Sequence, residues 1–164
     1  MTSGDFQPQP GPYGEPGGYP PPSGSQEPGG LGLRFVARLI DGIIVNVVAF
    51  AVALAIGALT NYWVTGLFSG LLMFVYFLAF ETTQGWTPGK KILGLSVRGP
   101  AGAPKPDVQQ SAIRNAWTLF NIIPFIGGLL VLVAVIVIAV TINGSPTKQG
   151  KHDELAGGTQ VVKG

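Results

Sequence analysis

Residues 34–59 read RFVARLIDGIIVNVVAFAVALAIGAL, an apolar stretch whose charges are confined to Arg34, Arg38 and Asp41. No charged residue occurs from Gly42 to Phe80. A helix of about 20 apolar residues, rising about 1.5 Å per residue, crosses the roughly 30 Å hydrocarbon layer of a membrane. We therefore interpret this stretch as the first transmembrane helix, with both arginines at the interface and Asp41 about two turns inside.

An ionisable side chain at the depth of Asp41 is costly, so it needs a partner or an aqueous lining. Arg38 and Asp41 are three residues apart, on one face of the expected helix, and we predict an ion pair between them, with Arg34 nearby. The pair either positions the helix or has a functional role. On this interpretation, Arg38→Leu destabilises the protein more than Asp41→Leu, because it leaves Asp41 alone in lipid.

The composition indicates an integral membrane protein. Of the 164 residues, 46% are hydrophobic and only 11% are charged, against about 25% charged in soluble domains. Mean hydropathy is +0.40. The chain has no cysteine and one histidine, so we predict no disulfide, no metal site and no cofactor. No nucleophile and base can be paired, so we do not expect an enzyme. The net charge of +2 gives no reason to expect nucleic acid as a partner.

Residues 1–30 form a Pro/Gly-rich segment with eight prolines and eight glycines. Such a segment buries too little apolar surface to offset its ordering entropy, so we predict a disordered tail. It is either a solvated tail or an arm that docks on a partner with an aromatic groove.

A second span is predicted over residues 64–80, after a short polar turn at 60–63 that carries two interfacial aromatics. Its Gly66 and Gly70 have the GxxxG spacing that lets helices approach closely. Glu81 ends this span and opens a charged loop over residues 81–114.

The positive residues of this loop orient the chain. Short loops rich in Lys and Arg favour the cytoplasmic side, and the loop carries five such residues: Lys90, Lys91, Arg98, Lys105 and Arg114. We therefore predict a cytoplasmic N-terminus, with the tip of the first hairpin outside. Within the loop, residues 92–97 favour a short strand.

A second uncharged run covers residues 115–147 and is broken by Pro124. It forms either one span preceded by an interfacial helix, or two short spans over 108–123 and 125–142. We favour two, because an even number of spans returns the lysines of the C-terminal tail to the inside.

The tail after residue 147 is polar and ends in a β-prone segment over 159–162, which we expect to pair with 92–97 as a two-stranded cap. The four-span topology also gathers four charged side chains at the cytoplasmic face. This predicted cluster consists of Glu81, Lys90, Arg114 and Asp153.

Four pieces of the sequence together resemble the RDD family of bacterial membrane proteins. They are Arg34 or Arg38 with Asp41, the segment TPGKKILGLSV at 87–97, Arg114, and HDELAGGTQVV at 152–162. The resemblance covers about residues 31–164. It maps the family's arginine to Arg34 or Arg38, and its two aspartates to Asp41 and Asp153. The leader also resembles that of proline-rich antigen proteins of actinobacteria. The family is largely uncharacterised, and some members have been linked to cation/proton antiport.

The sequence thus predicts an all-α integral membrane protein: a bundle of three to four transmembrane helices behind a disordered tail, in the bacterial plasma membrane. Its partners are the lipid bilayer, other membrane proteins or further copies of itself. We expect an accessory or scaffolding protein, because few polar side chains lie near membrane depth: Asn46, Ser69, Asn115, Thr118 and Asn121. The alternative is an ion or small-solute transporter in which Asp41 is the titrating group.

Overall fold

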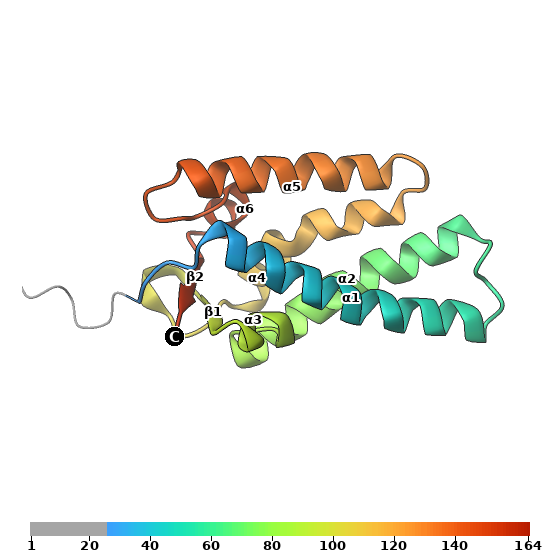
Figure 1. Ribbon diagram of the computed structural model, residues 1–164, viewed down its shortest axis with the longest axis horizontal. Helices are drawn as coiled ribbons and strands as arrows, with labels where there is room; N and C mark the ends of the chain where they lie inside the picture. Colours follow the sequence, from blue (N-terminus) through green and yellow to red (C-terminus); the bar gives the residue numbers. More distant parts are fainter. Residues whose placement is uncertain (1–25) are drawn as a thin grey trace, which may run out of the picture.

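The computed structural model describes residues 26–164. Three helices are long and apolar enough to cross a membrane: α1 (Leu31–Ala55), α2 (Tyr62–Gln84) and α5 (Gly127–Gly144). Figure 1 shows them lying roughly lengthwise beside one another, with most of the smaller elements gathered at the end where α1 begins. The predicted class, a mostly helical protein with membrane-spanning helices, is confirmed.

Most of the predicted disordered tail, 1–30, lies outside the described residues. Its last five residues are ordered and extended alongside the C-terminal strand. Pro28 forms a β-bridge with Val162, and the amide of Gly29 donates to the carbonyl of Val161 at 2.9 Å. The ordered domain therefore begins a few residues earlier than residue 31.

Helices α1 and α2 form the hairpin expected from the sequence. The side chain of Asn61 accepts hydrogen bonds from the amides of Trp63 and Val64, which otherwise lack partners at the start of α2. Gly85 ends α2 in the left-handed conformation, with φ of 74°. Because α2 continues to Gln84, Glu81 lies inside the helix rather than at its end as predicted.

The polypeptide between α2 and α5 is folded rather than a loop. It contains α3 (Pro88–Ile92), strand β1 (Leu95–Arg98), the short 3₁₀ helix η1 (Pro100–Gly102), α4 (Val108–Asn115) and a second 3₁₀ helix, η2 (Ala116–Ile122). The side chain of Asp107 caps α4 by accepting a hydrogen bond from the Gln110 amide. The side chain of Gln110 in turn accepts a hydrogen bond from the Asp107 amide.

The segment predicted as the third span, 108–123, is α4 followed by η2. It runs away from the end where α1 begins, and α5 returns to that end (Figure 1). It is not a long apolar helix, because one face of α4 carries the polar Ser111, Arg114 and Asn115, which are buried. In its second half, η2 packs closely on α2: a Cβ on Gly66 would lie 2.8 Å from the Asn121 carbonyl oxygen, and one on Gly70 would lie 2.9 Å from Ile122. The GxxxG prediction of close packing at these glycines is confirmed.

The predicted two-stranded cap is also confirmed. After helix α6 (Lys151–Leu155), strand β2 (Gln160–Lys163) pairs antiparallel with β1, and Val97 lies opposite Val161. Leu95, Val97 and Val161 are buried against Ala37 of α1. This small apolar core attaches the cap to the first helix and fixes the surroundings of the charged residues.

Candidate functional site

Asp41 joins α1 to α2 and α3. Its carboxylate is fully buried and accepts three hydrogen bonds: from the Tyr76 hydroxyl at 2.8 Å, from the Gly89 amide at 2.7 Å and from the Thr87 hydroxyl. Thr87 is the N-cap of α3, and the amides of a first helical turn are natural donors to an anion. Asp41 is therefore held by hydrogen bonds rather than by a cation.

Gly89 is required for this contact. A Cβ on Gly89 would lie 2.3 Å from the carbonyl oxygen of Ala37 and 2.9 Å from the Asp41 carboxylate. Only glycine lets the backbone of α3 approach α1 closely enough for its amide to reach Asp41.

The ion pair predicted between Arg38 and Asp41 is not formed. Within residues 26–164, neither Arg34 nor Arg38 has an oxygen of Asp41 within 4.0 Å. Arg38 instead donates to the side-chain oxygen of Asn115 at 3.1 Å, and its guanidinium carbon lies 3.6 Å from the centroid of the Phe77 ring. The donors of α3 satisfy Asp41, and the aromatic face and the amide hold Arg38.

Glu81 is the centre of one half of the charged cluster. Its carboxylate is fully buried and forms ion pairs with Lys90 and, at 3.6 Å, with Nε of Arg114. The other oxygen accepts hydrogen bonds from Ser111 at 3.0 Å and Asn115 at 2.9 Å. A buried carboxylate inside α2 is stable there because α3 and α4 supply two cations and two neutral donors.

Asp153 is the centre of the other half. Its Oδ1 lies 2.6 Å from Nη1 of Arg114 and 3.2 Å from the Thr159 hydroxyl. Its Oδ2 lies 3.1 Å from Nη1 of Arg34 and accepts the Gly150 amide at 3.1 Å. Arg114 thus bridges Glu81 and Asp153, and the four side chains predicted to gather, Glu81, Lys90, Arg114 and Asp153, do lie together in one network with Arg34.

Burial and neighbouring charge shift the titration of the cluster residues that lie outside the spans. Burial lowers the pKa of Lys90 to about 8, although Glu81 opposes this. Burial alone would raise the pKa of Asp153, but Arg114 and Arg34 hold it below its ordinary value. Lys90 is therefore mostly charged at neutral pH, and Asp153 is ionised.

His152 lies against the charged cluster, with its Nε2 3.6 Å from Oδ1 of Asp153. Burial lowers its pKa to about 3, with Asp153 opposing and the arginines adding to the decrease. Its Nδ1 is buried and has no hydrogen-bond partner among the described residues. At neutral pH it is a neutral imidazole beside Asp153.

Several residues of the network were not singled out as site residues from the sequence: Tyr76, Thr87, Ser111, Asn115 and Thr159. One signal was available, because Ser111, Arg114 and Asn115 have the i, i+3, i+4 spacing of a single helix face. That polar face predicts a buried polar network when it is flanked by apolar runs. The other contacts depend on chain segments far apart in sequence.

The arrangement brings four cations, Arg34, Arg38, Lys90 and Arg114, together with three carboxylates, Asp41, Glu81 and Asp153. The described residues contain no group of three or more His, Cys, Asp or Glu side chains placed to hold a metal ion. Chemically, the site can hold helices together and can bind an anion, since its excess formal charge is positive.

A mostly helical chain with three candidate spans and a buried Arg/Asp network at one end defines a small multi-helix membrane protein. The profile of the RDD family matches residues 28–157, and the chain belongs to that family. No curated protein and no solved structure matches the chain at a significant level.

Proposed function

We propose that the protein is an accessory or scaffolding protein of the membrane, and that it binds other membrane proteins through a polar groove at the hairpin end of the bundle. The groove has a volume of about 380 Å³ and lies between α1, α2 and the connection from η2 to α5. Besides Tyr62, its polar lining residues come from three parts of the chain: Asn46 from α1, Thr65 and Ser69 from α2, and Asn121 from η2.

The observation that carries this proposal is the unused hydrogen-bonding capacity of two asparagines. Asn46 is exposed on α1 and donates only to the Gly42 carbonyl of its own helix, at 2.8 Å. Asn121 forms no side-chain hydrogen bond with any of residues 26–164. In a bilayer, such amides favour hydrogen bonds across a helix–helix contact, which are worth about 1 kcal/mol. A partner helix seated in the groove supplies those bonds.

Transport of a cation is the second candidate, favoured by the complete burial of Asp41 beside the Tyr76 hydroxyl. Against it, three donors converge on Asp41 and occupy most of its acceptor sites, so little of the carboxylate is left to hold a transported cation. We therefore rank transport second. Proton-coupled cation flux into vesicles that is abolished by Asp41→Asn, in a variant that remains folded, would reverse the order.

Site-directed crosslinking in native membranes tests the accessory role, because the chain has no cysteine of its own. Thr65→Cys places a thiol in the groove, and Val133→Cys places one on the exposed face of α5 as the matched control. We expect a discrete crosslinked species from position 65 and not from position 133, and we expect Asn46→Leu with Asn121→Leu to weaken it. Equal crosslinking from both positions, or a product that the double substitution leaves unchanged, would contradict the proposal.

A further inference from the structure

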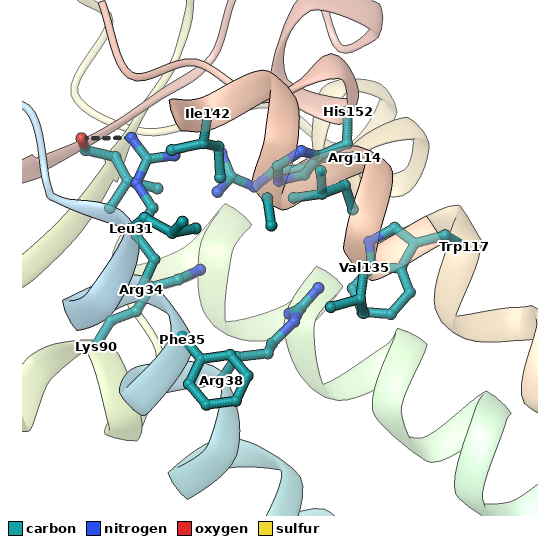
Figure 2. Close-up of a pocket in the computed structure, with 13 residues that line it drawn as sticks. Leu31, Arg34, Phe35, Arg38, Lys90, Arg114, Trp117, Val135, Ile142 and His152 are labelled. Atoms are coloured by element: carbon teal, nitrogen blue, oxygen red, sulfur yellow. Dashed lines mark hydrogen bonds between the residues drawn. The ribbon is translucent and has the colours of Figure 1, made fainter. Parts of the chain in front are cut away.

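A cationic cavity of about 100 Å³ lies at the opposite end of the bundle, between the start of α1 and the C-terminal half of α5. Four of its lining side chains are the cations of the charged cluster, Arg34, Arg38, Lys90 and Arg114, and none of its lining residues is acidic. Figure 2 shows the side chains of Arg38 and Lys90 directed into the space between the two helices.

These cations are held in place and largely desolvated. The side chains of Arg34 and Lys90 are 8% exposed, and that of Arg114 is 5% exposed. Each of these three has a carboxylate partner, whereas Arg38 has none within 4.0 Å among residues 26–164. Arg38 is half-buried and has no carboxylate in direct contact, so its guanidinium can take an anion as a partner.

A second observation points to an acceptor in the same place. Trp117 is one of the lining residues, and its Nε1–H group is buried and donates to no acceptor in the described chain. The Arg38 guanidinium also lies over the Trp117 ring, 4.8 Å from its centroid. Indole N–H and guanidinium are donors only, so a group that satisfies both must offer several acceptor oxygens. Phosphate is such a group, and arginine recognises it with paired hydrogen bonds.

Apart from the imidazole of His152, the rest of the lining is apolar and reaches the outer surface of the helices. It includes Phe35 of α1, which is 61% exposed, and Ile138 of α5. Both helices are candidate membrane spans, so this surface faces lipid tails. Basic pockets between transmembrane helices near the membrane surface are suited to anionic headgroups. We propose that the cavity binds the phosphate group of an anionic phospholipid, whose acyl chains lie against α1 and α5. A free phosphate ion offers the same oxygens but gains nothing from the apolar surface.

Binding can be followed through Trp117 itself. In a Trp63→Phe, Trp86→Phe background, Trp117 is the one remaining tryptophan. The full chain in neutral detergent is titrated with phosphatidylglycerol, with phosphatidylcholine and with inorganic phosphate. We expect a saturable change in Trp117 fluorescence and a rise in the unfolding temperature with phosphatidylglycerol alone. Saturation by inorganic phosphate at equal or lower concentration would overturn the assignment to lipid. Equal responses to both lipids would overturn the anion site.

Substitutions test whether the cavity is responsible. Arg38→Gln removes the cation that has no carboxylate partner, so it leaves no carboxylate unpaired, and we expect it to weaken phosphatidylglycerol binding about tenfold or more. Lys151→Gln, which removes an exposed charge on α6, is the matched control and should leave binding unchanged. If Arg38→Gln does not fold, Trp117→Phe gives an independent test, in which binding of phosphatidylglycerol is followed by the rise in unfolding temperature. Unchanged binding in both cavity variants would refute the proposal.

Discussion

Nη1 of Arg34 lies 3.1 Å from Oδ2 of Asp153, a contact between residues 119 positions apart in the sequence. The same guanidinium donates to the carbonyls of Gly29, at 2.8 Å, and Val161, at 3.1 Å. Arg34 therefore joins the segment before α1, the helix itself and the C-terminal strand. Its side chain is buried, so the contact is made without competition from bulk water.

Asp153→Asn should destabilise the protein strongly. It removes the negative charge that faces both Arg34 and Arg114, and breaking a buried ion pair by removing one partner costs about 3–5 kcal/mol. Thermal unfolding in detergent micelles measures the effect. Glu154→Gln is the control, because the Lys151–Glu154 pair on the same helix is about half exposed, and such pairs contribute about 0–1 kcal/mol. Equal melting temperatures for the two variants would contradict the role given to Asp153.

The members of the charged cluster were predictable, but their pairing was not. Charge-free runs of sequence locate α1, α2 and α5, and the topology then brings Glu81, Lys90, Arg114 and Asp153 to one end. Which carboxylate meets which cation depends on contacts that no local pattern encodes. One of these contacts is the close approach of the Gly89 backbone to Ala37. It gives Asp41 hydrogen-bond donors from α3, so that Asp41 does not pair with Arg38.

The predicted third span, 108–123, differs from the observed structure for another reason. The sequence from 115 to 147 is uncharged, so hydropathy gives no boundary within it, and Pro124 alone marks the break. The structure divides it into η2 and α5, and it places α4 before them as a polar helix. Burial of Ser111 and Asn115 is favourable only because Glu81 accepts their hydrogen bonds, and this is a tertiary effect.

Asp41→Leu should destabilise the protein more than Arg38→Leu, the reverse of the order expected from an Arg38–Asp41 pair. Removing the Asp41 carboxylate leaves Tyr76, Thr87 and Gly89 without their acceptor, and each unsatisfied buried donor costs about 1–3 kcal/mol. Arg38→Leu loses a hydrogen bond and ring packing but leaves no carboxylate unpaired. Unfolding temperatures of both variants in the same detergent decide the order. If Arg38→Leu lowers the unfolding temperature more, the hydrogen bonds of Asp41 do not determine how much Asp41 contributes to stability.

Gly89→Ala should destabilise the protein, because the added methyl group would overlap the Ala37 carbonyl and separate α3 from α1. We expect a loss of several kcal/mol, above the 1–3 kcal/mol typical of overpacking, since the obstacle is backbone rather than a movable side chain. Gly32→Ala in α1 is the control: nothing lies within 4 Å of its Cβ position, and alanine favours a helix. A Gly89→Ala protein that is as stable as the wild type would show that α3 can move away from α1 without a loss of stability.

Stability should fall as the pH decreases from 6.5 to 5, because of His152. Its pKa is 6.5 in an ordinary setting and about 3 in the fold, so in this range the unfolded chain binds a proton that the folded chain does not. The slope is at most about 1.4 kcal/mol per pH unit. The charged groups facing the imidazole are Asp153, Arg114, Arg38 and Arg34. Asp153 has its ordinary pKa at 3.8 and a lower one in the fold, so its own loss of stabilisation comes at lower pH.

His152→Gln isolates this contribution. The variant should show a flatter dependence of unfolding temperature on pH between 5 and 6.5, while the wild-type protein loses stability toward pH 5. Parallel profiles for the two proteins would mean that the imidazole titrates alike in the folded and unfolded chain.

The two ends of the described chain should lie on the same side of the membrane. The Gly29 amide bonds to Val161, and Arg34 pairs with Asp153, so the beginning of α1 and the C-terminal strand cannot be separated by a bilayer. Helix α3 and strand β1, between α2 and α4, lie at that same end (Figure 1), and the positive residues of this part of the chain favour the cytoplasm. Paired reporters fused after Gly164, one active only in the cytoplasm and one only outside, measure the side directly, and the same pair fused to the N-terminus gives the internal comparison. We expect cytoplasmic activity from both ends. A C-terminal reporter active only outside, with the N-terminal one active inside, would be incompatible with the Arg34–Asp153 contact and therefore with the cationic cavity.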